Sequence, residues 1–199
     1  DEIVKSGRRI ILIAGPSSSG KTTFAQRLCI QLRVNGKRPL YMGTDDYFVE
    51  REQAPVDEYG KFNFEDLDAV DVKLFNKQMN ELLEGKTVDM PVFDFVKGSK
   101  RYGTRITRAE ADQPIVIEGI HALNAALTGG IDDCEKYKIY ISPLTTLNID
   151  DNNRIPVSDL RLVRRIARDV RSRGRSATQT LGEWVKVREG EMKNIFPYS

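Results

Sequence analysis

The sequence predicts an α/β protein with a parallel sheet, because short apolar runs alternate along the chain with segments of helical periodicity. The chain has 199 residues, which is long enough to bury one sheet core and favours a single domain. Its composition of 40% hydrophobic and 30% charged residues is that of an ordinary globular protein. A net charge of +2 gives no support for a nucleic-acid or membrane partner.

A glycine-rich loop follows the first apolar run, residues 9–14, and precedes a helix that we expect over 22–35. Residues 15–22 read GPSSSGKT, a complete G-x-x-x-x-G-K-[ST] pattern. Backbone N–H groups and the helix N-terminus of such a loop cradle phosphates, the lysine reaches the β- and γ-phosphates, and the hydroxyl ligates Mg²⁺. We therefore predict a P-loop NTPase-type three-layer fold that binds nucleotide through Gly15, Pro16, Ser17, Ser18, Ser19, Gly20, Lys21, Thr22 and Thr23.

The remaining segments keep the order expected of alternating strands and helices. We expect strands over 39–44, 115–117 and 138–141, helices over 67–83, 158–173 and 177–194, and a small hairpin over 86–108 that lies off the main sheet. Polar, irregular residues at 49–64 suggest a loop over a site, and residues 145–157 form a polar insertion.

Two carboxylates at strand ends are candidates for catalysis and metal binding. Asp45 follows the strand over 39–44, and Glu118 follows the strand over 115–117. Because the carboxyl ends of parallel strands share the edge where the phosphate loop sits, both should lie near the γ-phosphate. One can accept a hydroxyl proton while the other holds Mg²⁺, directly or through water. The alternative for either is a helix N-cap or a turn, and Asp46 is the weaker candidate base because Asp45 directly follows the strand.

An arginine-rich segment over 158–176 is the second strong signal. Four arginines fall at i, i+3, i+4 and i+7 on one helix face and three more follow, namely Arg161, Arg164, Arg165, Arg168, Arg171, Arg173 and Arg175. Such a cluster repels itself unless anions or carboxylates lie opposite, and arginines on a movable flap can neutralise transition-state charge. We interpret the segment as a lid over the phosphates. A solvated helix face and an arginine-rich nucleic-acid contact are the alternatives.

Composition also indicates the cellular compartment and the absence of a histidine-based metal site. His121 is the single histidine, so the sequence indicates no histidine-based metal site. Cys29 and Cys134 follow no pattern and suggest free thiols in a reducing compartment. With neither a membrane-length apolar stretch nor a signal-peptide core, we expect a cytoplasmic protein. Because the chain begins at Asp1 and ends directly after a helical pattern, we expect 1–199 to be one domain of a longer polypeptide, with a processed or tag-cleaved start as the alternative at Asp1.

Several motifs together resemble those of the uridine kinase family, within the wider uridine kinase and phosphoribulokinase group of P-loop kinases. They are the phosphate loop, TDDYF at 44–48, FNFE at 62–65, PVFDFV at 91–96, EGI at 118–120, RRIARD at 164–169 and RGR at 173–175. The resemblance implies an ATP- and Mg²⁺-dependent kinase with a five-stranded parallel sheet, whose last strand follows residue 199. It also implies oligomers in many members.

The resemblance further implies a role for each matching residue. It makes Asp45 the base for a ribose 5′-hydroxyl and, with Lys21, Arg168 and Arg173, a catalytic residue; the two arginines would contact phosphates from the lid. It places Mg²⁺ beside Thr22, Glu118 and Asp45. On the acceptor side, next to the hairpin, it places Phe64, Glu65, Phe93, Arg165, Arg175 and Glu183.

Four acceptor-side positions depart from the family pattern. Phe93, Gly98 and Glu183 stand where the family usually has tyrosine, histidine and glutamine, and Glu65 replaces an aspartate that contacts the ribose. A site built to hydrogen-bond a pyrimidine edge loses affinity without such partners. The sequence therefore supports kinase chemistry better than it supports uridine as the acceptor.

Three functions stay open at this point. The first is a kinase of a nucleoside such as uridine or cytidine, and the second is the same chemistry on a sugar phosphate or another metabolite. The third is a nucleotide-binding regulatory or RNA-associated domain with little turnover, in which the arginine face meets nucleic acid. Under the first two we expect ATP and a small-molecule acceptor as partners, with neither membrane nor nucleic acid, and we leave a homo-oligomer open.

Overall fold

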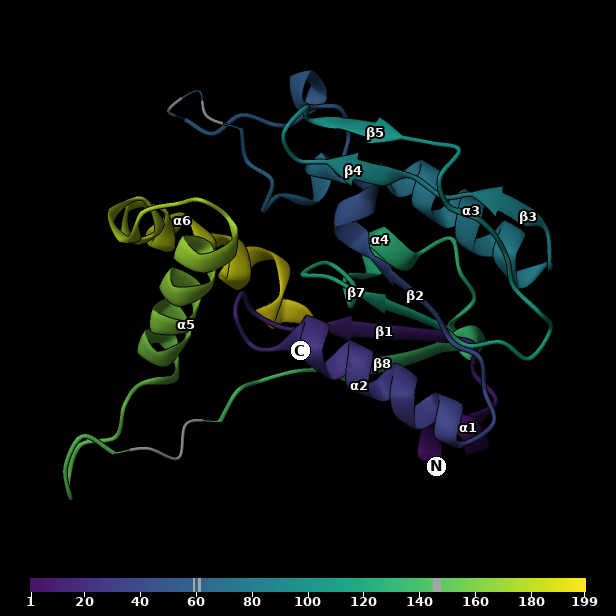
Figure 1. Cartoon of the computed structure of the whole chain (residues 1–199), viewed down its shortest axis with the longest axis horizontal. Helices are drawn as coiled ribbons and strands as arrows, with labels where there is room; N and C mark the ends of the chain where they lie inside the picture. The colour runs from purple at the N-terminus through teal and green to yellow at the C-terminus, as the bar shows by residue number, and fades with distance from the viewer. Residues whose placement is uncertain (59, 61, 145–147) are drawn as a thin grey trace.

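The computed structural model describes residues 1–58, 60, 62–144 and 148–199. Its centre is a parallel sheet with the strand order β2 (Leu40–Gly43), β7 (Ile115–Glu118), β1 (Ile10–Ala14) and β8 (Lys136–Tyr140), as Figure 1 shows. The register sets Glu118 beside both Ile13 and Gly43, and Ile13 beside Ile139. The carboxyl ends of the strands therefore lie level at one edge of the sheet.

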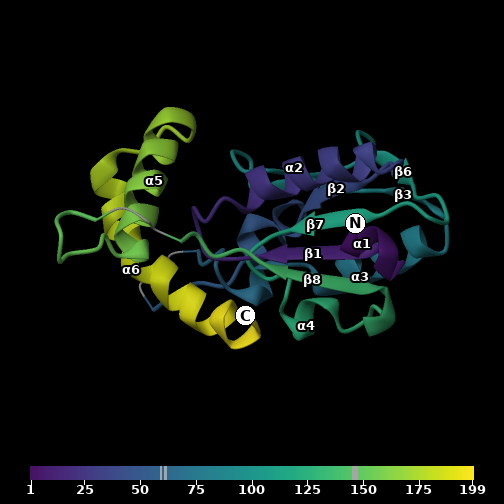
Figure 2. The same cartoon turned by 90° about the horizontal axis from the view of Figure 1, so that it is seen from below.

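Helices cover both faces of this sheet, which confirms the predicted three-layer α/β fold. Residues of β1 alternate between the faces: Ile11 and Ile13 pack towards α2 (Lys21–Val34), whereas Ile10 and Leu12 pack towards α3 (Val72–Leu83) and α4 (Ala125–Thr128). Figure 2 shows α2 on one side of the sheet and α3 with α4 on the other. Burial on both faces explains why β1 is a continuous apolar run.

The main sheet has the four strands that the sequence places within these residues. The resemblance implied five parallel strands with the last one after residue 199, and the residues that the structure describes form four, so the fifth stays a prediction. Within these residues β8 is an edge strand, since it pairs only with β1. It begins at Lys136, two residues before the predicted start.

The residues between α3 and β7 form two short antiparallel ribbons apart from the main sheet. β3 (Thr87–Asp89) pairs with β6 (Ile106–Arg108), and β4 (Val92–Asp94) pairs with β5 (Ser99–Arg101) inside it. The sequence predicted one small hairpin over these residues. The structure has a nested pair, because the chain turns twice, first around Gly98 and then around Gly103.

Helices α5 (Val157–Ser172) and α6 (Ala177–Asn194) pack on each other and stand beyond the carboxyl end of the sheet (Figures 1 and 2). Gly174, with φ 63°, allows the turn between them. Ser176 and Gln179 then form a capping box, in which each side chain accepts the other residue's backbone N–H. The segment predicted as a lid, 158–176, thus consists of α5 and this turn.

The helix predicted over 67–83 is interrupted at its start. Residues Leu67–Ala69 form a separate 3₁₀ turn that Asp66 caps, and α3 begins only after Asp71, whose side chain accepts the N–H of Leu74 at 3.0 Å. Two competing caps divide one apolar pattern into two elements.

The other elements are short. They are α1 (Glu2–Ser6) before β1 and the 3₁₀ turns Thr44–Tyr47, Arg51–Gln53, Asp133–Glu135 and Phe196–Tyr198. Residues 59 and 61 of the predicted loop and 145–147 of the predicted polar insertion lie outside the described residues. Within the described part of the chain, none of the helices combines the length and the apolar character that a bilayer crossing requires.

Candidate active site

The phosphate loop connects β1 to α2 with a strained and tightly packed backbone. Gly20 (φ 102°) and Ser18 (φ 60°) lie in the left-handed region, which costs a non-glycine residue such as Ser18 about 1–2 kcal/mol. At Gly15 a β-carbon would come 2.2 Å from the carbonyl oxygen of Ile141, so only glycine fits. The buried hydroxyls of Ser18 and Ser19 have no hydrogen-bond partner among the described residues. A bound phosphate would supply acceptors for them.

Lys21 begins α2 and turns back over the loop. Its Nζ donates to the carbonyl oxygen of Pro16 at 3.2 Å. Burial lowers the pKa of Lys21, and the nearby carboxylates of Glu118, Asp45 and Glu65 oppose that shift. The lysine therefore lies among the acids that the sequence placed at the sheet edge.

Glu118 ends β7 and brings together residues from three elements. One oxygen of its carboxylate accepts the Thr22 hydroxyl at 2.8 Å and the Tyr41 hydroxyl at 3.3 Å. Glycine follows because a β-carbon at Gly119 would lie 1.8 Å from Oγ1 of Thr44. The structure thus places Thr22 and Glu118, two of the three predicted metal ligands, in direct contact.

The two aspartates after β2 have different surroundings. Asp46 forms an ion pair with Arg105, with 2.7 Å between Oδ2 and Nη1. The carboxylate of Asp45 keeps contact with solvent, but the surrounding protein removes much of its hydration. This desolvation, followed by the charge of Glu118, raises the pKa of Asp45 to about 6. Of the pair, Asp46 is held by an arginine, whereas Asp45 has a base strength suited to proton transfer near neutral pH.

Lys21 and Arg173 both act on Asp45, and their charges oppose the rise in its pKa. The phosphate loop, the end of β2 and the lid therefore converge on this carboxylate. Mutual repulsion between Asp45 and Glu118 is the interaction that a divalent cation would remove. Carboxylate and hydroxyl oxygens are also the ligands that Mg²⁺ prefers, so Asp45, Glu118 and Thr22 fit that ion.

Asp169, buried within α5, gathers three arginines of the lid. Its carboxylate lies 2.8 Å from Arg168, 3.6 Å from Arg165 and 3.9 Å from Arg173, and it accepts the Thr180 hydroxyl at 3.3 Å. Burial by itself would raise the pKa of Asp169, but the arginines hold it below the usual range. The two predicted phosphate contacts, Arg168 and Arg173, are thus held together by one internal carboxylate.

Three residues predicted on the acceptor side bind other groups of this chain. Nη1 of Arg165 donates to the Ser17 hydroxyl at 2.7 Å, so this arginine contacts the phosphate loop. Arg175 and Glu183 form an ion pair with each other near the turn between α5 and α6. The structure therefore places Arg165 against the phosphate loop and pairs the other two with each other.

A cluster of phenylalanines lies beside the hairpin. Phe48, Phe64, Phe93 and Phe95 pack against one another in tilted and edge-to-face contacts, with ring centroids 5.2–6.4 Å apart. Phe48 and Phe93 are buried, whereas Phe95 is 62% exposed. The predicted acceptor residues Phe64 and Phe93 thus belong to an apolar surface that is open at one end.

Glu65, also predicted on the acceptor side, lies close to the lid and the phosphate loop. Burial raises its pKa, Arg165 opposes that rise and Asp45 adds to it. Its backbone carbonyl accepts Nδ2 of Asn194 at 2.9 Å. Gly190 of α6 leaves room for it, because a β-carbon there would lie 3.0 Å from the β-carbon of Glu65.

Gly98 sits where the resemblance gives histidine, and Arg51 fills the space beside it. Gly98 has φ 72°, and a β-carbon there would lie 2.6 Å from Nε of Arg51. Nη2 of Arg51 donates to the Phe95 carbonyl at 2.6 Å, and its backbone N–H donates to the Gly98 carbonyl at 2.8 Å. The arginine thus closes the β4–β5 turn from inside.

Sequence reasoning noted Asp169 among the arginines without predicting its burial, and it missed Glu191. Both are 1% exposed, and Glu191 accepts the backbone N–H of Ser17 at 2.9 Å and pairs with Arg161. The repulsion within the arginine cluster signalled that carboxylates must lie opposite. It did not signal which of these acids point inward, because α5 carries two and α6 carries three.

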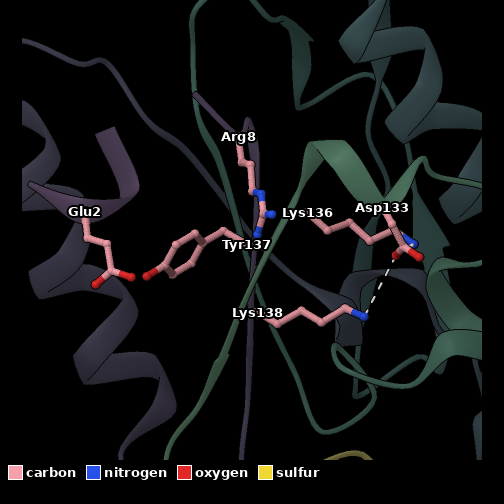
Figure 3. Close-up of a pocket in the computed structure, with 6 residues that line it drawn as sticks. All are labelled: Glu2, Arg8, Asp133, Lys136, Tyr137 and Lys138. Atoms are coloured by element: carbon pink, nitrogen blue, oxygen red, sulfur yellow. Dashed lines mark hydrogen bonds and ion pairs between the residues drawn. The ribbon is translucent and has the colours of Figure 1, made fainter. Parts of the chain in front are cut away.

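A surface cavity of about 390 Å³ lies away from all of these residues, along the edge strand β8 (Figure 3). Charged side chains line it, namely Glu2, Arg8, Asp133, Lys136 and Lys138, together with Tyr137. Lys136 and Lys138 both lie within ion-pair distance of Asp133. None of the predicted site residues lines this cavity.

Comparison with known proteins places this site in a family. The sequence profile described as "Phosphoribulokinase / Uridine kinase family" matches residues 10–198. The chain belongs to the phosphoribulokinase/uridine kinase family. It is therefore a P-loop kinase, a phosphotransferase that uses a nucleoside triphosphate.

Among its relatives, a uridine kinase of Ligilactobacillus salivarius is 30% identical over 175 residues, 88% of this chain and 73% of that protein. A uridine kinase of Lactobacillus johnsonii is 31% identical over 183 residues, 92% of this chain and 78% of that protein. A candidate fructose transport system kinase from Silicibacter sp. TM1040 has a similar structure, with a TM-score of 0.63 at 14% identity over 98% of this chain and 94% of that one. A candidate uridine kinase from Bacillus stearothermophilus gives 0.55 at 19% identity over the same shares. The two structures support the fold of this family member.

Proposed function

We propose that this chain transfers the γ-phosphate of ATP, with Mg²⁺, to a hydroxyl of a small ring-bearing acceptor, specifically the 5′-hydroxyl of a nucleoside. One observation carries the proposal. A partly solvated carboxylate with a pKa of about 6, that of Asp45, lies within electrostatic reach of the loop lysine, the Glu118 carboxylate and a lid arginine. That combination supplies a base, a phosphate-binding cation and a metal-side acid at one place.

In this proposal each residue has a defined task. Asp45 accepts the proton of the attacking hydroxyl, while Lys21 binds the β- and γ-phosphates. Thr22 and Glu118 would hold Mg²⁺, which supplies charge neutralisation between the phosphates when bound. Arg168 and Arg173, kept together by Asp169, close on the phosphates from the lid side. These residues position charge and move one proton, and phosphoryl transfer needs little more from a protein.

The acceptor is proposed from the phenylalanine cluster. Half-buried Phe64 and exposed Phe95 leave apolar ring surface accessible beside the buried Phe93, and the aromatic base of a nucleoside can pack there. Arg51 and the turn at Gly98 leave no room for a histidine there. An acceptor recognised by stacking more than by hydrogen bonds to its ring edge is therefore favoured.

The departures from the family pattern on the acceptor side are also compatible with a second class of acceptor. A sugar phosphate would use the lid arginines and would not need a base-stacking surface.

For a nucleic-acid contact, the support is weaker than the sequence indicated. Arg161, Arg165 and Arg168 are directed onto carboxylates of this chain, so they do not form a free basic face.

A screen for acceptor-dependent ADP release tests the proposal. Purified protein with Mg²⁺ and ATP would be offered nucleosides and sugar phosphates in turn, and ADP would be measured. We expect nucleosides to stimulate release. Stimulation by sugar phosphates alone would show that the acceptor is a sugar phosphate and not a nucleoside. If no small hydroxyl compound stimulated ADP release, the kinase proposal would be contradicted.

The pH profile of the acceptor reaction should follow the ionisation of Asp45. A base must be deprotonated to work, so kcat/KM for the acceptor should drop about tenfold per pH unit below about pH 6 and level off above it. Saturating Mg²⁺ should move this limb to lower pH, because the cation stabilises the ionised carboxylates. A profile that is flat between pH 5 and 8 would contradict the assignment.

Substitutions at Gly98 and Phe93 should affect different properties, the first stability and the second the preference among acceptors. Gly98→His places a side chain at a positive φ and against Arg51, so we expect a lower melting temperature and no gain in uridine turnover. Phe93→Tyr only adds a hydroxyl to a buried ring, and it should change the ratio of turnover between acceptors while leaving ATP affinity unchanged. Equal effects of Phe93→Tyr on all acceptors would contradict its placement beside the ring.

A further inference from the structure

Ser17 of the phosphate loop is held at all of its polar groups by side chains of α5 and α6. Its N–H donates to Oε1 of Glu191 at 2.9 Å, its carbonyl accepts Nε of Arg161 at 2.9 Å, and its hydroxyl accepts Nη1 of Arg165 at 2.7 Å. We call Arg161, Arg165 and Glu191 the loop clasp. All three side chains are more than nine-tenths buried.

The charges of the loop clasp are balanced within the protein. Arg161 and Glu191 form an ion pair with each other, and the second oxygen of Glu191 accepts Nη1 of Arg188 at 2.8 Å. Arg161 also lies over the ring of Trp184, 5.4 Å from its centroid. A buried carboxylate with two guanidinium partners is a fixed part of the fold, because breaking either contact leaves an uncompensated charge.

The strained residue of the loop follows the clasped one directly. Ser18 has φ 60°, a conformation that a non-glycine residue keeps only where its surroundings enforce it. The clasp fixes the groups on both sides of the Ser17 α-carbon, and so it fixes the peptide that enters Ser18. The residues after Ser18 carry the amides and the lysine that face the phosphates.

The clasp also connects the loop to the lid. Arg165 lies 3.6 Å from Asp169, and the same carboxylate holds Arg168 and Arg173. One network of ion pairs and hydrogen bonds therefore runs from the lid arginines through Asp169 and Arg165 to the hydroxyl of Ser17 in the phosphate loop.

We propose that Arg161 and Glu191 are positioning residues, which set the phosphate loop in its nucleotide-binding shape before the nucleotide arrives. They act through the peptide groups of Ser17 and touch neither ATP nor the acceptor. The inference rests on the proposed function for the identity of the nucleotide. Under this proposal the clasp specifically holds Ser18 in its strained conformation, and does not only stabilise the fold in general.

The test replaces the clasp pair without leaving a buried charge. In the double variant Arg161→Met, Glu191→Leu, the Ser17 peptide groups lose their partners, and we expect the dissociation constant for Mg²⁺–ATP to rise about tenfold or more. Adding Ser18→Gly should recover most of this loss, because glycine adopts positive φ without strain. Binding is measured by calorimetry without acceptor, and melting temperatures identify the folded variants.

A matched control is Lys193→Met, which removes an ion pair with Asp66 from the same helix without contact to the loop. It should leave ATP binding unchanged. If the double variant does not fold, Arg161→Met alone gives the same comparison, because the Ser17 carbonyl loses its donor while the Glu191 carboxylate keeps Arg188 as a partner. We expect a smaller loss there, again recovered by Ser18→Gly.

Two results would overturn the positioning role. One is a folded clasp variant that binds ATP within about twofold of the wild-type protein. The other is a loss of binding that Ser18→Gly does not recover, since this would make the clasp a general stabilising contact. Wild-type protein that binds ATP but phosphorylates no acceptor would contradict the proposed function and leave the clasp standing.

Discussion

Asp45→Asn is expected to lower kcat by about 10²-fold or more, with ATP affinity little changed. Asparagine keeps the shape of the side chain but cannot accept the hydroxyl proton. The same change should raise the melting temperature slightly at pH 7. The pKa of Asp45 is raised from 3.8 to about 6 in the folded state, so ionised Asp45 destabilises the fold above this range, but Asp45 is exposed and solvent screens most of the effect. The gain should vanish below about pH 4.

The control for this prediction is Asp46→Asn. Asp46 is paired with Arg105, so its replacement should lower stability and reduce kcat far less than Asp45→Asn does. A variant pair with the opposite pattern, in which Asp46→Asn abolishes turnover and Asp45→Asn does not, would show that the base was assigned to the wrong aspartate.

Lys21→Ala is expected to lower kcat/KM for ATP by about 10²–10³-fold while the protein stays folded. The change removes the cation aimed at the β- and γ-phosphates, whereas its hydrogen bond in this structure is a 3.2 Å contact to its own loop. Burial lowers the pKa of Lys21, which means that the folded protein disfavours the charged form of this lysine. Removing the Lys21 side chain should therefore not reduce the melting temperature.

Lys37→Ala is the matched control for Lys21→Ala. Lys37 pairs with Asp112 on the surface and lies apart from the phosphate loop, so its loss should change turnover by less than about twofold. Turnover by Lys21→Ala near the wild-type level would exclude the loop as the site of phosphate transfer.

The phosphate loop and the strand-end acids could be predicted because their signals are local or topological. The motif GPSSSGKT by itself predicts the conformation of the phosphate loop. Parallel strands bring Asp45 and Glu118 to one edge of the sheet regardless of the conformation of the loops between them. The choice of Asp45 over Asp46 followed from position alone. Arg105, 59 residues away in sequence from Asp46, holds Asp46 in an ion pair and so supports this choice, which stays a prediction.

The inward-facing acids could not be predicted in the same way. Glu189 and Glu191 are two residues apart on α6, and only the packing of α5 against α6 decides that Glu191 is buried while Glu189 is exposed. Gly98 was interpreted as a missing base contact, because no sequence pattern links it to Arg51. The start of α3 was misplaced because Asp66 and Asp71 are both good caps, and the chain uses both.

Transfer of label from [γ-³²P]ATP to a nucleoside tests the central claim most directly. With Mg²⁺, the wild-type protein should move the label to the nucleoside as its monophosphate, while Asp45→Asn should bind ATP equally well and transfer about 10²-fold less. Label that appears only as inorganic phosphate, or transfer that Asp45→Asn leaves undiminished, would contradict the account of Asp45 as the base of an acceptor kinase.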